Sequence, residues 1–321
     1  MVRRRKFLQA ATFAASLTIL QFVFYAPAQS DEAARVVHIG YQKYGNFILL
    51  KGTGELEKKL KPLGVKVEWT EFPSGPPLLE ALNAGAVDIG QTGEAPPIFA
   101  QAANAGFVYI GHEPPAPKGE AILVPKNSPI KSVAELKGKK IALNKGSNVH
   151  YLLVKVLEKA GIKYSDVQPE FLAPADGLAA FENGAVDAWA IWDPYQASAE
   201  STVGARTLAD GTDAVENNQF YLASKSFVAT NPRIVDVVLA ALADVDHWAA
   251  GNASTVARQL SAGIGIPAPV LEIALKRQTY GVSPLDDHTI AQQQAIADTF
   301  YLLHLLPKPI TVSDAVRRTG S

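Results

Sequence analysis

The chain has 321 residues, a length that corresponds to about two domains, and no cysteine, which excludes disulfides, thiolate metal sites and a thiol nucleophile. The formal net charge at pH 7 is −1. Without the first 28 residues, which hold four basic side chains and no carboxylate, 26 basic and 31 acidic side chains remain. The resulting net charge of −5 argues against a nucleic-acid-binding protein, which would normally carry a basic excess.

The first 28 residues have the pattern of a secretory signal peptide. A basic start, Arg3–Lys6, precedes an apolar run, Phe7–Tyr25, and a small-residue cleavage site, Ala26–Ala28. Arg4 and Arg5 also resemble the twin-arginine export signal of bacteria. An uncleaved membrane anchor is the alternative, but polar residues interrupt the apolar run. We therefore expect residues 1–28 to be removed and the mature chain to be exported to the periplasm.

Between residue 36 and residue 111, strand-like and helix-like segments alternate. Apolar or alternating runs predict strands at Val36–Gly40, Val65–Phe72 and Val108–Gly111, and helical patterns lie between them at Asn46–Leu63, Leu78–Ala84 and Ile98–Asn104. This alternation is typical of an α/β lobe.

The second half of the chain returns to the same plan. After a proline-rich interruption, Ala121–Val124 is apolar enough for a strand that runs between two lobes, and Phe220–Ala223 is a candidate return strand. Helical spacing predicts three helices near the end, at Pro232–Ala250, Pro269–Gln278 and Asp287–Leu306. Because the chain leaves the second lobe before these helices, we expect them to pack on the first lobe or on the hinge.

Two pairs of similar segments indicate an internal duplication. Gly85–Pro96 and Gly184–Tyr195 both begin Gly-Ala-Val-Asp, 99 residues apart, and each has a helix-closing glycine, a short buried strand and a helix start. Gln42–Asn46 and Asn144–Asn148 are a second pair, in which a polar turn follows a strand. So long a period favours two similar lobes over a solenoid. Since open α/β sheets bind ligands beyond the carboxyl ends of their strands, such polar turns are candidate ligand sites.

Seven stretches give the sequence a specific resemblance to a known family. They are Gly40–Lys43, Trp69–Gly75, Gln91–Ala102, Asn144–Ser147, Asp187–Tyr195, Phe220–Ala223 and Leu306–Lys308. On these stretches the chain resembles the solute-binding proteins of bacterial ABC importers for aliphatic sulfonates. The wider group includes binders of taurine, nitrate and thiamine precursors. The likeness covers nearly all of the chain after the signal peptide.

The resemblance implies an α/β fold of the two-lobed periplasmic binding protein type (type II). Each lobe would be a mixed sheet flanked by helices, with a hinge of two crossing strands. Lobe 1 would comprise residues 33–118 and 226–321, and lobe 2 residues 119–225. The resemblance also implies a monomer without a cofactor, which closes on a small-molecule alkanesulfonate. It would deliver this ligand to an ABC transporter permease that has a separate ATPase subunit.

A sulfonate is permanently anionic, so its pocket must supply hydrogen-bond donors. Helix N-termini offer free N–H groups and the positive end of the helix dipole, and glycines let the backbone approach the ligand. The predicted ligand-binding residues are Gln42, Gly45, Asn46, Thr92, Gly93, Glu94, Lys145, Gly146, Ser147, Asn148, Trp192 and Asp193. Each turn taken alone is also explained as an ordinary helix cap, but their correspondence across the duplication favours a site.

Two kinds of side chain in this set require separate explanations. Trp189 and Trp192 would point to opposite faces of a strand, and we expect Trp192 to form an apolar wall for an alkyl tail. Glu94 would either cap its helix or pair with a cationic nitrogen of a zwitterionic ligand, and the second is our hypothesis. The sequence departs from the family pattern at Tyr44–Phe47, at Asn148 and at Glu94, which leaves the identity of the ligand open.

The sequence contains none of the common catalytic motifs: no nucleophile elbow, no His-Glu-x-x-His and no phosphate-binding loop. The six histidines are dispersed without the spacing of a metal site. We therefore expect no catalytic residue and no metal. The remaining alternatives are a binder of taurine, of nitrate or bicarbonate, or of a thiamine precursor, and a periplasmic enzyme on the same fold. A binding titration without turnover separates a binder from an enzyme.

Overall fold

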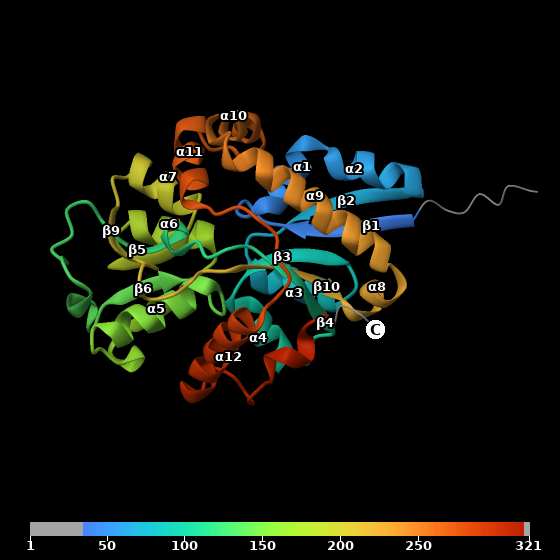
Figure 1. Ribbon diagram of the computed structural model, residues 1–321. Helices are drawn as coiled ribbons and strands as arrows, with labels where there is room; N and C mark the ends of the chain where they lie inside the picture. Colours follow the sequence, from blue (N-terminus) through green and yellow to red (C-terminus); the bar gives the residue numbers. More distant parts are fainter. Residues whose placement is uncertain (1–34, 318–321) are drawn as a thin grey trace, which may run out of the picture. The chain divides into compact units, whose positions relative to one another are not determined.

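Two five-stranded sheets with the same strand plan organise the part of the chain that the structure, a computed structural model, describes, residues 35–317 (Figure 1). The predicted signal peptide, residues 1–28, lies outside this range. Within residues 35–317, no helix has both the length and the apolar composition that a membrane crossing requires.

The first sheet has the strand order β2-β1-β3-β10-β4. Its strands are β1 (Arg35–Tyr41), β2 (Val65–Glu71), β3 (Ile89–Gly93), β4 (Phe107–His112) and β10 (Gln219–Ser224). β1 pairs in parallel with β2 and β3, whereas β10 is antiparallel to β3 and β4. The sheet is therefore mixed, as predicted.

The second sheet has the order β7-β6-β8-β5-β9, which matches the first sheet position by position. Its strands are β5 (Glu120–Val124), β6 (Lys140–Leu143), β7 (Gln168–Phe171), β8 (Ala188–Trp192) and β9 (Arg206–Asp210). β6 is parallel to β7 and β8, and β5 is antiparallel to β8 and β9. The predicted duplication is therefore present at the level of the whole sheet.

The fourth strand of each sheet comes from a distant part of the chain. β5 pairs wholly within the second sheet, so it does not run between lobes as its sequence led us to expect. β10 falls in the range 119–225 expected for lobe 2, yet its pairing places it in the first sheet. By strand pairing, the chain returns to the first sheet before Gln219.

The two crossings between the sheets, residues 113–119 and 211–218, are irregular segments rather than strands. They are joined by hydrogen bonds from Gly211 N to Pro117 O and from Ala116 N to Glu216 O, each 2.9 Å long. Three prolines among residues 113–119 lack the N–H that a strand ladder needs, which explains why no strand forms there.

The helices that accompany the sheets agree with the predicted plan of alternating strands and helices, and they differ from it in their exact bounds. They are α1 (Asn46–Thr53), α2 (Glu55–Leu60), α3 (Gly75–Asn83), α4 (Ala95–Ala102), α5 (Asn148–Lys159), α6 (Pro174–Glu182) and α7 (Tyr195–Thr202). Short 3₁₀ turns lie at Lys61–Leu63, Pro117–Gly119, Val133–Leu136, Tyr164–Asp166 and Val312–Ala315. The single helix predicted for 46–63 is broken, because Gly54 adopts a left-handed φ of 66° between α1 and α2.

The last hundred residues form five helices, of which three were predicted. They are α8 (Lys225–Thr230), α9 (Pro232–Ala250), α10 (Ala253–Ile264), α11 (Ala268–Arg277) and α12 (Asp287–Leu302). Val238 and Leu242 of α9 belong to the core of the first sheet, and Phe300 of α12 packs in the cluster around α4. α11 instead contacts α7 of the second lobe, where Arg277 forms an ion pair of 2.6 Å with Glu200. These helices therefore pack on both lobes.

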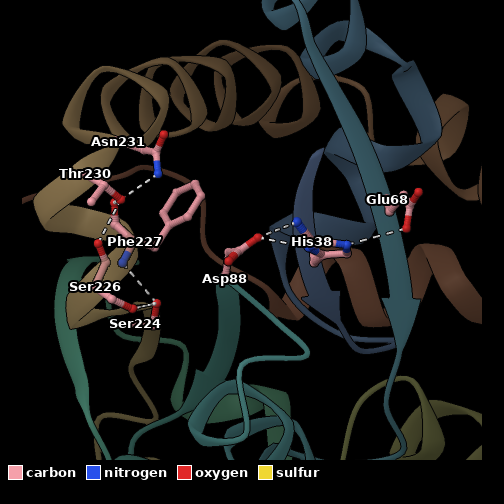
Figure 2. A network of polar contacts seen from close by, with 8 residues as sticks. All are labelled: His38, Glu68, Asp88, Ser224, Ser226, Phe227, Thr230 and Asn231. Atoms are coloured by element: carbon pink, nitrogen blue, oxygen red, sulfur yellow. Dashed lines mark hydrogen bonds and ion pairs between the residues drawn. The ribbon is translucent and has the colours of Figure 1, made fainter. Parts of the chain in front are cut away.

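The repeated aspartate has one structural role in both sheets. Asp88 accepts a hydrogen bond from His38 N at Oδ2 and donates its own N–H to His38 O, both at 2.8 Å (Figure 2). Asp187 makes the same pair of bonds with Lys140, at 2.9 and 2.8 Å. In each lobe this residue joins the start of one strand to its parallel neighbour, at the opposite end of that strand from the polar turn.

Candidate functional site

The predicted polar turns lie at the carboxyl ends of strands, and turns from the two sheets meet. Gln42–Asn46 follows β1, Gln91–Glu94 ends β3, and Lys145–Asn148 follows β6. A Cβ atom added to Gly93 would lie 2.8 Å from Asn148 Cγ, so the backbone of the first lobe touches a side chain of the second. Only glycine fits position 93 while the turns are this close.

The turn after β1 is held by Gln91, a residue that was not among the predicted ligand-binding residues. Gln42 donates from Nε2 to Gln91 O, and Phe47 N donates to Gln91 Oε1, both at 3.0 Å. A Cβ atom on Gly45, whose φ is +88°, would lie 2.3 Å from Gln91 Nε2. Asn46 is buried and accepts a hydrogen bond from Gln278 of the chain after α11. Gly45 is therefore required both for its backbone angle and for this close approach.

The end of β3 places Thr92, Gly93 and Glu94 in the interior. Thr92 Oγ1 donates to Gly93 O at 3.0 Å. Glu94 is 2 % exposed, and its Oε2 accepts a hydrogen bond of 3.0 Å from Asn218 N. Its side chain makes no capping bond to α4. Burial raises the pKa of Glu94 to about 8, against the opposing effect of the Asn218 N–H. Glu94 is thus not the ordinary helix cap that was one of its two interpretations.

The turn after β6 is largely engaged with its own lobe. Gly146, with a left-handed φ of 71°, donates its N–H to Nδ1 of the buried His150 at 3.2 Å, and Ser147 Oγ donates to Asn144 O at 2.7 Å. Lys145 is exposed, with Nζ 5.4 Å from the centre of the Phe171 ring. A ligand that uses these donors must therefore replace bonds within the chain.

Asn148 is the residue of this turn that reaches furthest across the molecule. Its Nδ2 donates to Glu120 Oε2 and, at 3.1 Å, to Asn217 Oδ1. Glu120 begins β5, and Asn217 belongs to the returning crossing segment. The amide of Asn148 therefore joins the anion-binding turn predicted from the sequence to the start of β5 and to the crossing that returns to the first sheet.

Trp192, which ends β8, and Asp193, which follows it, are buried in the second lobe. Trp192 is 4 % exposed and packs edge-on to Tyr195, with ring centres 6.4 Å apart, while Trp189 packs against α6 on the opposite side of the strand. Asp193 Oδ1 caps α7 by accepting a 3.0 Å bond from Ala197 N, and it lies 3.5 Å from Arg277 Nη1. Burial raises the pKa of Asp193 to about 7, although Arg277 opposes the shift.

Buried carboxylates are the main feature that the sequence prediction missed. Glu113, Glu120 and Asp246 are all at most 2 % exposed, and burial raises the pKa of each. Glu113 Oε1 accepts hydrogen bonds from Tyr221 Oη, at 2.8 Å, and from Gln91. A signal was present, because Glu113 and Glu120 flank the proline-rich crossing and Glu120 directly precedes four apolar residues.

A separate polar hollow lies at the amino-terminal ends of the strands of the first sheet. It is lined by Arg35, His38, Asp88, Ser226, Thr230 and Asn231, with Phe227 between them. Figure 2 shows His38 between Asp88 and Glu68, with nitrogen–oxygen distances of 3.1 and 3.6 Å. None of the predicted turns contributes to it. Among residues 35–317, no group of three or more His, Asp or Glu side chains is placed to hold a metal ion.

The matched sheets, each with polar turns beyond the carboxyl ends of its parallel strands, define a protein of the two-lobed periplasmic binding protein fold. The family model described as "NMT1/THI5 like" matches residues 61–253. The chain belongs to this family and, within it, is similar to proteins named for binding aliphatic sulfonates.

Three similar proteins support this placement. An Escherichia coli (strain K12) protein named for aliphatic sulfonate binding is 45% identical over 91% of this chain and 90% of its own length. The structure of the alkanesulfonate-binding protein SsuA from Xanthomonas axonopodis pv. citri bound to MOPS has a TM-score of 0.85 and 42% identity, and covers 88% of this chain and 98% of that chain. The structure of the periplasmic aliphatic sulphonate-binding protein SsuA from Escherichia coli has a TM-score of 0.81 and 44% identity, and covers 89% of this chain and 93% of that chain.

Proposed function

We propose that this protein is an extracytoplasmic solute-binding protein that captures alkanesulfonates between its two lobes and delivers them to an ABC transporter permease for sulfur uptake. The meeting of the Gly93 turn with Asn148 carries the proposal, because it brings polar turns of both sheets to one place. The sulfonate-binding names of the similar proteins support the choice of ligand class.

The proposed site uses the chemistry that an anion requires. Backbone N–H groups at the starts of α1 and α5 can surround sulfonate oxygens, with the positive ends of the helix dipoles directed at the charge. At the start of α4 only Ala95 offers an N–H, because Pro96 and Pro97 have none. Gln42, Thr92 and Ser147 add side-chain donors, and Trp192 lies near the same edge of the second sheet. Because most of these groups are buried and engaged, we propose that the lobes separate to admit the ligand and close around it.

The proposed cellular context follows from the same class of protein. The protein would be exported, lose residues 1–28 and act as a monomer in the periplasm, with the ATPase activity in a separate subunit. It would bind its ligand without transforming it. Edman sequencing of the protein isolated from the periplasm should return a sequence that begins near Gln29, and a start at Met1 would contradict removal of the signal peptide.

A thermal-shift panel tests the proposed function directly. A ligand that binds only the folded state raises the melting temperature by mass action. We expect alkanesulfonates to raise it and sulfate, nitrate, bicarbonate and a pyrimidine thiamine precursor to leave it unchanged. Recovery of the sulfonate unaltered after prolonged incubation would separate a binder from an enzyme. A shift with nitrate alone, or with the pyrimidine alone, would replace the proposed ligand by one of the alternatives.

A further inference from the structure

Two buried carboxylates from opposite lobes lie on either side of Asn148. Glu94 precedes α4 in the first lobe, and Glu120 begins β5 in the second sheet. Asn148 donates to Glu120 through its amide, while its Cγ is the atom that an added Cβ on Gly93, the neighbour of Glu94, would meet at 2.8 Å. The negative charge of Glu94 also acts on Glu120 and, after burial, is the next cause that raises its pKa.

Each of these carboxylates has one satisfied and one unsatisfied oxygen. Glu94 Oε2 accepts from Asn218 N and Glu120 Oε2 accepts from Asn148, but Glu94 Oε1 and Glu120 Oε1 are buried and have no hydrogen-bond partner. The side-chain Oδ1 of Asn218 is likewise buried without a donor. Such unpaired buried acceptors are costly unless a ligand supplies donors for them.

Tyr44 provides an independent observation at the same place. Its hydroxyl is buried and has no hydrogen-bond partner, although it lies 2.4 Å from the position of a Cβ on Gly119, the residue before Glu120. Burial and then the charges of Glu113, Asp193 and Glu120 raise its pKa. A buried neutral phenol beside Glu120 is therefore available to a bound molecule.

An alkanesulfonate without another polar group can accept from the Tyr44 hydroxyl but has no donor for the unpaired oxygens of Glu94 and Glu120. It brings only acceptor oxygens and a negative charge, and a charge 4 Å from an ionised carboxylate costs about 4 kcal/mol at an effective dielectric of 20. A protonated amine on the same molecule would bring N–H donors and the opposite charge. It would also favour the ionised form of both carboxyl groups, and it would do so only while both lobes contribute them.

We propose that the preferred ligands are zwitterionic sulfonates, whose ammonium group is held between Glu94 and Glu120 while the sulfonate group takes the donors of the helix-starting turns. This inference rests on the proposed function and narrows its substrate class. One carboxylate comes from each lobe, so an ammonium group contacts both only when the lobes are closed. Ligands with an ammonium group would therefore favour closure more than ligands without one.

A matched pair of ligands tests the proposal. Taurine and isethionate share a two-carbon sulfonate and differ in an ammonium against a hydroxyl group. By calorimetry at pH 7, we expect the wild-type protein to bind taurine at least tenfold more tightly than isethionate. Glu94→Gln and Glu120→Gln should each reduce this ratio to less than threefold. Glu158→Gln, the same change at an exposed position of α5, should leave the ratio unchanged.

A second measurement needs only the wild-type protein, in case either variant fails to fold. Three other titratable groups face this pair: Glu216, Tyr151 and Tyr44. The raised pKa of Glu94, about 8, leaves it protonated at pH 7. An ammonium group that enters between the carboxylates should therefore release a proton. Calorimetry in two buffers of different ionisation enthalpy should detect proton release with taurine and none with isethionate.

The outcomes separate this inference from the proposed function. Equal affinity for taurine and isethionate, or a ratio that neither Gln variant changes, would overturn the ammonium site and leave sulfonate binding intact. Proton uptake with isethionate, with affinity that rises as pH falls from 8 to 6, would also overturn it, because the carboxyl groups would then be donors to the anion. Failure of taurine, isethionate and ethanesulfonate to bind at all would contradict the proposed function itself.

Discussion

The corresponding helix and strand of the two lobes divide large and small residues in opposite ways. In the first lobe Leu78 of α3 fills the space over Gly90 of β3, where an added Cβ would lie 2.3 Å from Leu78 Cδ2. The matching positions 99 residues later hold Gly177 in α6 and Trp189 in β8, and a Cβ on Gly177 would lie 2.7 Å from Trp189 Nε1. In both lobes a large side chain thus packs against a glycine, but the large side chain lies on the helix in the first lobe and on the strand in the second.

The same comparison distinguishes the two edges that face each other. Gly93 ends β3 and leaves room for Asn148, whereas its counterpart Trp192 is a buried indole. Glu94 and its counterpart Asp193 each keep one buried oxygen without a hydrogen-bond partner, but Asp193 also caps α7 and lies 3.5 Å from Arg277. At this edge the first lobe therefore contributes a small residue, and the second contributes a buried indole and a carboxylate that lies beside an arginine.

Removal of the large member of each pair should have the largest effect. Trp189→Ala should lower the free energy of unfolding by about 3–5 kcal/mol and Leu78→Ala by about 2–5 kcal/mol, because each leaves a cavity beside a glycine. Urea denaturation of both variants measures the two losses. Losses below about 1 kcal/mol would show that the neighbouring side chains collapse into the space and that the pairs do not carry the packing.

Enlargement of the small member should have an intermediate effect. Gly177→Ala gains about 1 kcal/mol of helix propensity but overpacks a rigid indole, so we expect a net loss of about 1–2 kcal/mol. Gly90→Ala should cost less, since a leucine methyl group can turn aside. Combination of Gly177→Ala with Trp189→Phe should restore stability. A penalty that persists in the double variant would mean that the indole is not what position 177 contacts.

The two acidic counterparts should give different pH profiles. The folded-state pKa values of Glu94, about 8, and Asp193, about 7, lie above their ordinary values of 4.5 and 3.8. The stability each contributes is present below its ordinary pKa and is lost as pH rises towards the folded-state value. Glu94→Gln should therefore reduce the loss of stability from about pH 4.5 to about pH 8, and Asp193→Asn the loss from about pH 3.8 to about pH 7, so that only the first variant changes the profile between pH 7 and 8. Chemical denaturation at intervals from pH 5 to 9 tests this. Identical profiles for the two variants would contradict the assignment.

The smallest effect is expected from the two lysines of the corresponding turns. Lys145 is exposed, whereas Lys43 Nζ donates to Ile264 O at 3.3 Å. Lys145→Ala should weaken sulfonate binding by about 0.2–1 kcal/mol at low ionic strength, and salt should abolish the difference. Calorimetry at two salt concentrations, with Lys43→Ala for comparison, measures it. A loss that salt does not change would identify Lys145 as a direct ligand of the anion.

Much of the fold was predictable because the duplication is visible in the sequence. Gly85 and Gly184 close helices with φ angles of 77° and 75°, as the repeated Gly-Ala-Val-Asp segments predicted. The pairing partners of β5 and β10 were not predictable, since an apolar run carries no information on which sheet it completes. α10 was missed although Val256, Leu260 and Ile264 recur at helical spacing within it.

The candidate site was predictable in position but less so in contacts. The turns were found because polar residues follow predicted strands. A turn that follows a strand lies at the carboxyl end of that strand, which fixes the edge of the sheet that it occupies. The contact between Gly93 and Asn148 depends on how the two lobes meet. No local pattern in either lobe contains that information.

The late position of β10 in the chain makes the two lobes unequal during synthesis. All five strands of the second sheet lie between residues 120 and 210, so this sheet is complete as soon as that stretch is available. In the first sheet β10 lies between β3 and β4, and until residue 224 is made, these two strands have open edges and no connection through the sheet. The lobe that starts the chain is thus the lobe that finishes folding last, because its closure depends on a contact of high sequence separation.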